Sequence, residues 1–269
     1  MRYFLHIGYN GAAYRGWQRQ INVKSVQEVL ETELSKMLNQ RIIIHGCGRT
    51  DAQVHASQYF LHFNYEKEID FDFVFRINKM LPDDISVFDI IPVHENANAQ
   101  LDALKRTYDY YIHFRKDPFL SQFSTLYLLE NLDFEKMKEA ATLFTVHKDY
   151  KSLCLAPNIY KSTICKISSS QLFVNKNENR LRFQISSNRF LRGMIRSIIG
   201  RLLEIGEGKL SVEELEDGLK GKQNAYSNKL AYPQGLYLSK VEYKYLNLER
   251  RSNFAGMLEN RMDDNWKTV

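Results

Sequence analysis

Cysteine and proline are scarce in this chain of 269 residues, which has three cysteines and five prolines. No two cysteines form a Cys-x-x-Cys pair, so neither a disulfide framework nor a thiolate zinc site is expected. No segment approaches eighteen consecutive apolar residues, and the opening residues MRYFLHIGYN are typical of a strand rather than a signal peptide. These absences predict a globular, cytoplasmic chain without a membrane segment.

Acidic residues are missing from one stretch in which arginine is concentrated. Residues 180–202, RLRFQISSNRFLRGMIRSIIGRL, contain no Asp, Glu or Lys and six arginines: Arg180, Arg182, Arg189, Arg192, Arg196 and Arg201. The net charge of the whole chain is only +5, so this segment dominates the positive charge. Because the planar guanidinium bonds phosphates bidentately, the segment predicts a polyanionic partner. Six such contacts would make log affinity fall with log salt at a slope of roughly −4 to −5.

Apolar periodicity and helix caps predict an α+β fold. The expected strands are 2–9, 41–47, 57–65, 85–93, 105–114 and 236–243, with a hairpin turning at 175–179. The expected helices are one opened by Ser25, one near 70–81, one near 133–146, one from about 189, and one opened by Ser211. This order suggests two ferredoxin-like, split βαβ-type halves that share a mixed, mainly antiparallel central sheet with a catalytic cleft between them. The expected division is 1–115, 116–245 and a tail, 246–269.

Asp51 is the only acidic residue between residues 41 and 63. A two-metal site needs several converging carboxylates, and the chain has no Gly-x-Ser-x-Gly nucleophile elbow, so metal and serine hydrolase chemistry are poorly supported. Asp51 can therefore be a lone nucleophile or base, or a loop aspartate that caps backbone N–H groups. The residues alone leave both interpretations open.

Three segments carry basic or aromatic residues that could contact a ligand. Arg189, Arg192 and Arg196 recur at helical spacing and predict one shared face, either solvated or facing a ligand. Tyr108 lies on an expected strand, where it can simply pack or can stack on an unpaired base. The early loop YNGAAYRGWQRQ combines Trp17 with Arg15 and Arg19, a pattern that fits RNA better than a DNA groove.

Five segments in order resemble the TruA family of tRNA pseudouridine synthases. GRTDAQVHA (48–56) resembles its Gly-Arg-Thr-Asp-Ala-Gly-Val-His-Ala segment, and KRTYDYY (105–111) its Arg-x-Tyr-x-Tyr strand. YNGAAYRGWQRQ with SVQEVLE resembles the opening of the family, NRFLRGMIRSIIGRLLEIGEGK its arginine helix, and QGLYLSKVEY its closing strand. The resemblance spans residues 1 to about 245 and implies isomerisation of uridine to pseudouridine in the anticodon stem-loop of tRNA, without cofactor or metal.

The resemblance also implies roles for individual residues. Asp51 matches the catalytic aspartate, Arg196 its ion-pair partner, and Tyr108 the tyrosine that stacks on the target uracil. Leu236 matches a residue lining the pocket, and Arg49 one that helps extrude the base. The further candidates for substrate binding are Arg15, Trp17, Arg19, His55, Arg189 and Arg192. A homodimer that shares one tRNA is implied as well.

Two departures from the family pattern keep alternatives open. Gln53 stands where the family usually has glycine, and a positive φ there would cost a side chain roughly 1–2 kcal/mol. Asn98 and Gln100 replace a histidine and an arginine of the usual His-Ala-Arg-Phe segment, which removes a potential RNA or internal contact. The alternatives are a paralogue acting on another uridine or RNA, and an RNA-binding protein of the same fold that catalyses poorly.

Overall fold

The computed structural model describes residues 1–175, 179–222, 230–249, 251 and 267–268. These residues form two compact units, each of which is described by itself. Unit 1 comprises Met1–Arg106 and the described residues from Tyr237 to Arg251, and unit 2 comprises Thr107–Leu236 and Lys267–Thr268. The sequence suggested halves of residues 1–115 and 116–245 followed by a tail, 246–269, whereas the closing strand groups with unit 1 from Tyr237 onward. The reason is a pairing distant in sequence, His55 with Tyr237.

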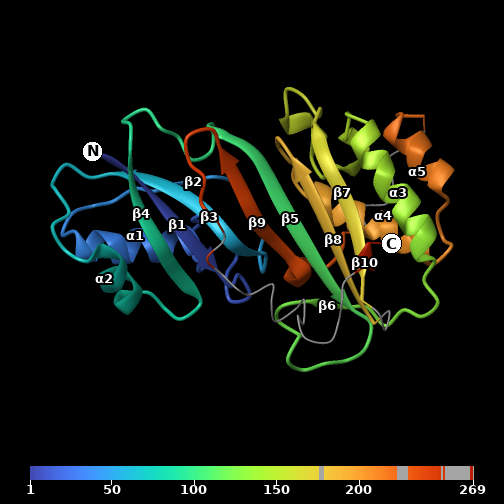
Figure 1. Ribbon diagram of the computed structural model, residues 1–269, viewed down its shortest axis with the longest axis horizontal. Helices are drawn as coiled ribbons and strands as arrows, with labels where there is room; N and C mark the ends of the chain where they lie inside the picture. Colours follow the sequence, from blue (N-terminus) through green and yellow to red (C-terminus); the bar gives the residue numbers. More distant parts are fainter. Residues whose placement is uncertain (176–178, 223–229, 250, 252–266, 269) are drawn as a thin grey trace. The chain divides into compact units, whose positions relative to one another are not determined.

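Unit 1 contains an antiparallel sheet extended by one parallel strand (Figure 1). Its elements are β1 (Arg2–Tyr9), α1 (Val26–Met37), β2 (His45–Gly46), β3 (His55–Asn64), α2 (Phe73–Met80), β4 (Ile85–Val93) and β9 (Leu236–Tyr243, whose first residue belongs to unit 2). The strand order is β9-β3-β1-β4, with β2 paired to β3. Every residue of β3 except Asn64 is buried, so this strand is covered on both faces. The loop that carries Asp51 thus leads into the most buried strand of the unit.

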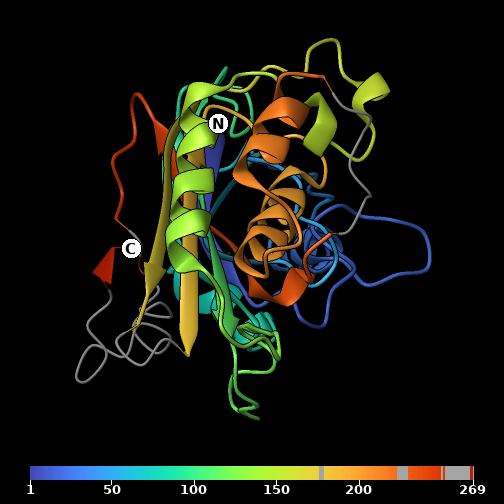
Figure 2. The same ribbon diagram turned by 90° about the vertical axis from the view of Figure 1, so that its right-hand side faces the viewer.

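Unit 2 repeats the combination of antiparallel strands and helices (Figure 2). Its α-helices and strands are β5 (Ala103–His113, whose first residues belong to unit 1), β6 (Thr125–Leu126), α3 (Phe134–Val146), β7 (Ile167–Val174), β8 (Arg180–Ser187), α4 (Met194–Gly206), α5 (Val212–Leu219) and β10 (Lys267–Thr268). The described residues of this unit also form the short 3₁₀ helices η1 (Lys151–Leu153), η2 (Pro157–Ile159) and η3 (Pro233–Gly235). The strand order is β10-β7-β8-β5 with β6 beside β5, and α3 packs on β7 and α4.

Helix caps that are visible in the sequence form as expected. The Ser25 side chain accepts the Glu28 amide at 3.3 Å and begins α1. Ser211 and Glu214 form a complete capping box at the start of α5. The strands expected at 2–9, 85–93 and 236–243 have the expected bounds, and together these elements confirm the α+β class. The expected strand 41–47 is reduced to β2, and the tip of the 175–179 hairpin lies outside the described residues.

The helix expected from about residue 189 is wrong at its beginning. Helix α4 begins at Met194, because its N-cap residue Gly193 has a φ of 72°. A residue in this left-handed conformation cannot continue a right-handed helix. Arg189 and Arg192 therefore precede the helix, and the three arginines do not share one helical face.

Candidate active site

The Asp51 loop, residues 47–54 between β2 and β3, is held through its backbone carbonyl groups. The Cys47 carbonyl accepts a hydrogen bond from Arg106 Nη2 at 2.7 Å. The Gly48 carbonyl accepts the Tyr59 hydroxyl at 2.5 Å. Each of these bonds replaces one that water would otherwise make, which restricts the loop to one conformation.

The centre of the Asp51 loop is tied to the preceding loop, residues 10–24. The Thr50 carbonyl accepts the Trp17 amide at 3.2 Å, and the Thr50 hydroxyl bonds the Tyr9 hydroxyl at 2.9 Å. Gly16 has a φ of 94°, and a Cβ there would lie 2.5 Å from the Thr50 oxygen. The close approach of the two loops consequently requires glycine at position 16.

Asp51 begins a tight turn with Gln53 in the left-handed region. The Val54 amide donates to the Asp51 carbonyl at 3.2 Å, and Gln53 has a φ of 64°. Gln53 occupies the third position of this turn, where a positive φ favours glycine or asparagine. The positive φ suspected from the sequence is confirmed. The Asp51 side chain is half-buried, and that of Gln53 is exposed.

Trp17 and His55 are supports of the Asp51 loop. Trp17 is only 3% exposed, and its ring stacks on Tyr59 with a centroid distance of 4.1 Å. His55 is 1% exposed, accepts the Gly11 amide through Nδ1 at 3.0 Å and stacks on Tyr237. Direct contact of either side chain with RNA stays a prediction, and this burial favours a supporting role instead.

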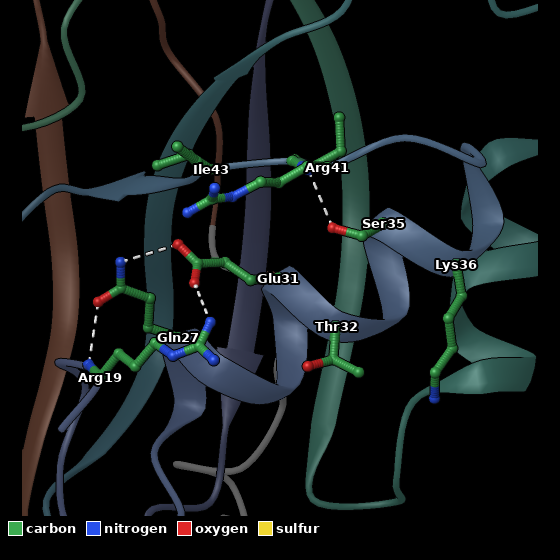
Figure 3. Close-up of a pocket in the computed structure, with 9 residues that line it drawn as sticks. Arg19, Gln27, Glu31, Thr32, Ser35, Lys36, Arg41 and Ile43 are labelled. Carbon is green, nitrogen blue, oxygen red and sulfur yellow. Dashed lines mark hydrogen bonds and ion pairs between the residues drawn. The ribbon is translucent and has the colours of Figure 1, made fainter. Parts of the chain in front are cut away.

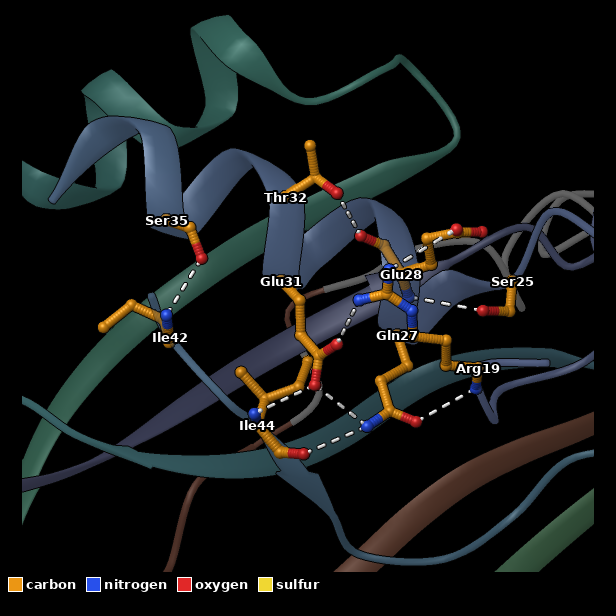
Figure 4. A network of polar contacts seen from close by, with 9 residues as sticks. All are labelled: Arg19, Ser25, Gln27, Glu28, Glu31, Thr32, Ser35, Ile42 and Ile44. Atoms are coloured by element: carbon orange, nitrogen blue, oxygen red, sulfur yellow. Dashed lines mark hydrogen bonds and ion pairs between the residues drawn. The ribbon is translucent and has the colours of Figure 1, made fainter. Parts of the chain in front are cut away.

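The three arginines of unit 1 that were expected to bind substrate are exposed, but they differ in their pairing. Arg19 Nη1 bonds the carboxylate of Glu31 at 3.2 Å, and Arg19 Nη2 lies 3.9 Å from Glu28. Glu31 also accepts the amide of Ile44, so Arg19 belongs to a network that fixes α1 (Figure 4). Arg15 and Arg49 have no ion pair within the part of the chain that the structure describes.

A cavity of unit 1 lies beside this network. It has a volume of about 610 Å³, and Figure 3 shows Arg19 and Glu31 bonded to each other within its lining. The residues around it are Arg19, Gln27, Glu31, Thr32, Ser35, Lys36, Arg41, Ile42 and Ile43. Asp51 is not among them. The cavity is a groove along α1 rather than the site of the expected chemistry.

In unit 2, Tyr108 and Asp109 occupy adjacent positions on β5 and face opposite ways. Tyr108 is 8% exposed, and its ring packs edge to face against Phe190 with centroids 5.2 Å apart. Asp109 is 1% exposed and accepts Arg182 Nε and Gln184 Nε2, both at 2.9 Å. The buried ion pair fixes the strand beneath Tyr108.

Arg196 lies on α4 and is fixed by the backbone of Ala231. Its Nε donates to the Ala231 carbonyl at 2.6 Å, and the Ala231 amide donates back to the Arg196 carbonyl at 3.0 Å. The next residue, Tyr232, accepts the Tyr110 hydroxyl through its carbonyl at 2.7 Å. Burial raises the pKa of Tyr110 well above its usual value, and the charge of Arg196 opposes that rise. The Arg196 guanidinium and the Tyr110 hydroxyl are thus bonded to the carbonyls of two adjacent residues, Ala231 and Tyr232.

The remaining arginines of the 180–202 segment are not all available to a ligand. Arg182 is held by Asp109, and Arg201 is 4% exposed and bonded to Glu204 at 2.6 Å. Arg189 lies over the ring of Tyr160, at 5.6 Å from its centroid, and Arg192 is exposed. The expectation that all six arginines bind phosphate is wrong for Arg182 and Arg201.

Leu236 begins β9 and is 6% exposed. It follows Gly235, where a Cβ would lie 2.5 Å from the Tyr111 carbonyl oxygen. The chain can thus pass close to β5 only with glycine before Leu236.

The predicted site residues are divided between the two units. Unit 1 carries Arg15, Trp17, Arg19, Arg49, Asp51 and His55, whereas unit 2 carries Tyr108, Arg189, Arg192, Arg196 and Leu236. The ion pair between Asp51 and Arg196 stays a prediction. Sequence reasoning missed Tyr59 and Arg106 as supports of the Asp51 loop. Arg106 had a signal, since it opens the Arg-x-Tyr-x-Tyr segment, but Tyr59 had none.

Among the described residues, no three His, Cys, Asp or Glu side chains are grouped so that they could hold a metal ion. In the same residues, no helix is both long and apolar enough to cross a bilayer.

Comparison with known proteins identifies the family. The family model described as tRNA pseudouridine synthase matches residues 140–244. A tRNA pseudouridine synthase A of Bacteroides fragilis is 41% identical over 245 residues, which cover 90% of this chain and 96% of that protein. The corresponding protein of Porphyromonas gingivalis is 36% identical over 245 residues, covering 90% of this chain and 97% of its own. The chain belongs to the tRNA pseudouridine synthase family.

Proposed function

We propose that Asp51 is the catalytic carboxylate with which this chain isomerises uridine to pseudouridine in the anticodon stem-loop of tRNA. Uridine isomerisation in tRNA follows from membership of the family, and the chain is accordingly an RNA-modifying isomerase. The observation that carries the role of Asp51 is the loop around it, whose carbonyls at Cys47, Gly48 and Thr50 all have fixed donors. A reactive carboxylate benefits from such a rigid support.

The reaction exchanges one ribose bond of uracil for another. The bond from ribose C1′ to N1 breaks, the bond from C1′ to C5 forms, C5 loses its hydrogen as a proton, and N1 gains one. An ionised aspartate serves this sequence by attacking the ribose, by attacking the uracil ring, or by stabilising a transient glycal. The balance of atoms requires no oxidant, reductant or cofactor.

Arg196 and Tyr108 are proposed to complete the site. An opposite charge within a few ångströms favours the ionised form of a carboxylate, which is the assigned role of Arg196 toward Asp51. The Ala231 carbonyl orients the Arg196 guanidinium from one side. Tyr108, buttressed edge to face by Phe190, stacks on the target uracil. Leu236 lines the pocket, and Arg49 occupies the space left by the extruded base.

The RNA is held by cations at the surface of both units. Arg15 in unit 1 and Arg189 and Arg192 in unit 2 are the proposed phosphate contacts. The chain acts in the cytoplasm as a homodimer, in which one tRNA contacts both subunits. The two departures from the family pattern favour a second candidate of the same chemistry, directed at another uridine or another RNA.

Chemical mapping of pseudouridine in unmodified tRNA transcripts tests the target. We expect new pseudouridine in the anticodon stem-loop and none elsewhere. Pseudouridine confined to another arm would contradict the stem-loop assignment and support the second candidate. Binding without pseudouridine in any transcript would contradict the proposed function and leave an RNA-binding protein.

A further inference from the structure

Arg106 joins three backbone carbonyl groups of unit 1 through one guanidinium. Nη2 donates to the Cys47 carbonyl at 2.7 Å and to the Gln100 carbonyl at 2.8 Å. Nε reaches the same Cys47 oxygen at 3.2 Å, and Nη1 lies 3.4 Å from the Ala103 carbonyl. The Arg106 side chain is half-buried. These contacts connect the first residue of the Asp51 loop to the segment that precedes β5.

The segment before β5 is shaped to present its carbonyl to Arg106. Asn98 Oδ1 accepts the amides of Gln100 and Leu101 at 2.9 and 3.0 Å. The backbone amide of Asn98 donates to Asp102 Oδ2 at 2.8 Å, and this bond closes the turn. Asn98 is one of the departures from the family pattern, and it has a structural explanation here. Its side chain folds the turn whose Gln100 carbonyl binds the guanidinium.

Only arginine can make this set of contacts. Its planar group carries five N–H donors and stays charged, whereas lysine offers one compact ammonium that cannot reach Cys47 and Gln100 in the same geometry. Hydrogen bonds from a charged donor to a carbonyl are stronger than neutral ones. Arg106 also lies two residues before Tyr108 on β5, and side chains at that spacing share one face of a strand.

We propose that Arg106 is a positioning residue for catalysis, because it fixes the entry of the Asp51 loop to the strand that carries Tyr108. The inference rests on the proposed role of Asp51. Arg106 itself contacts no reacting atom; it acts through the Cys47 carbonyl. Loss of the bond frees the beginning of the Asp51 loop, while the centre stays tied through Thr50.

The test compares Arg106→Lys with Arg2→Lys. Arg2 is a matched control, since Arg2 Nη1 donates to the Ala97 carbonyl at 2.9 Å in the neighbouring turn but does not touch the Asp51 loop. We expect Arg106→Lys to lower kcat for pseudouridine formation about 10- to 100-fold, because a displacement of about 1 Å can cost that much. The Kd for tRNA should stay within about threefold of the wild type. Arg2→Lys should keep kcat within about twofold.

Two further readouts separate positioning from general destabilisation. Hydrogen exchange of peptides covering residues 47–54 should accelerate in Arg106→Lys and not in Arg2→Lys, and this holds whether or not the wild type modifies the RNA tested. Added ethylguanidinium should partly restore kcat in Arg106→Ala. Unchanged exchange in Arg106→Lys, or an equal loss of kcat in both lysine variants, would overturn the proposal. Faster exchange in Arg106→Lys with an inactive wild type would support the role of Arg106 in holding the Asp51 loop. It would contradict the proposed function instead.

Discussion

At the scale of single residues, Asp51 lies close to a strained residue, Gln53, which the neighbouring loop holds in place. Gln53 has a φ of 64°, and its amide donates to the Tyr14 carbonyl at 3.1 Å, so the conformation is imposed by the neighbouring loop. A residue with a side chain is strained in this conformation, whereas glycine is not. The fixed turn is what presents the carboxylate of Asp51.

Replacing Gln53 with glycine should therefore stabilise the protein. Relief of the left-handed strain, less the extra entropy of glycine in the unfolded chain, gives about 0.5–1 kcal/mol. Gln53→Ala is the control, because it removes the exposed side chain but keeps the strain, and it should change the free energy of unfolding very little. Urea denaturation measures both. Destabilisation by Gln53→Gly would mean that the glutamine side chain supports the loop.

At the scale of elements, α4 depends on the left-handed residue before it. Gly193 has a φ of 72°, and a Cβ there would lie 2.6 Å from Leu155 Cγ. Gly208, which follows the same helix, has a φ of 71° and no atom within 4 Å of its virtual Cβ. Substitutions at the two glycines therefore separate the cost of a left-handed backbone conformation from the cost of a steric clash.

Gly208→Ala should destabilise the protein by about 1–2 kcal/mol, the cost of the left-handed conformation alone. Gly193→Ala should cost about 1–3 kcal/mol more, because Leu155 must move. Thermal unfolding compares the two. Equal losses of stability in the two variants would show that Leu155 can move aside without a cost in free energy. Only Gly193→Ala should also lower kcat, since it alters the beginning of the helix that carries Arg196.

The same elements show what the sequence can and cannot predict. Caps are local, so Ser25 and Ser211 predicted the beginnings of α1 and α5 correctly. The helix expected from residue 189 failed, because a glycine in a helical pattern does not reveal the sign of its φ. The parallel pairing of β9 with β3 joins residues far apart in sequence, which no local pattern encodes.

The candidate site was predictable to a similar degree. The lone acid of the Asp51 loop and the arginine concentration were visible as composition. The burial of individual side chains was not visible in the sequence, because it depends on partners elsewhere in the chain. Arg182 is bound to Asp109, and Trp17 is covered by Tyr59. The supports Tyr59 and Arg106 act on carbonyl groups, which every residue has and no motif marks.

At the scale of the whole molecule, the pairing of arginines sets the salt dependence of RNA binding. With Arg182 and Arg201 in internal ion pairs and Arg196 assigned to Asp51, at most three arginines of the 180–202 segment, Arg180, Arg189 and Arg192, are left for phosphates. Log Kd measured against log salt should then change with a slope of roughly 2 to 3 from this segment, rather than 4 to 5. Arg192→Gln should reduce the slope by about 1, and Arg201→Gln should leave it unchanged. A reduced slope for Arg201→Gln would contradict this division.

Buried histidines make the stability of the molecule depend on pH. Burial, together with the nearby charges of His45 and Arg2, lowers the pKa of His62 from 6.5 to about 4. Burial also lowers the pKa of His6 and of His113. Below pH 6.5 the unfolded chain binds protons that the folded chain does not, so stability should fall as the pH drops from about 6.5 toward 4.

Urea denaturation midpoints across this pH range measure the loss. His62→Asn keeps an acceptor for the Ala99 amide, since its Oδ1 takes the place of His62 Nδ1, which accepts that amide at 3.2 Å, but asparagine cannot titrate. The variant should therefore show a shallower decline than the wild type. A decline of the same steepness would show that His62 contributes nothing to acid sensitivity.

The central claim is that Asp51 carries out the isomerisation, and release of tritium from C5 of labelled uridine in unmodified tRNA tests it most directly. The formation of the bond to C5 must expel that hydrogen. We expect release by the wild type and by the control Asp83→Asn, which alters an exposed carboxylate outside the site. Asp51→Asn should bind tRNA with an affinity within a few fold of the wild type and release no tritium. Release by Asp51→Asn at the wild-type rate would contradict the account.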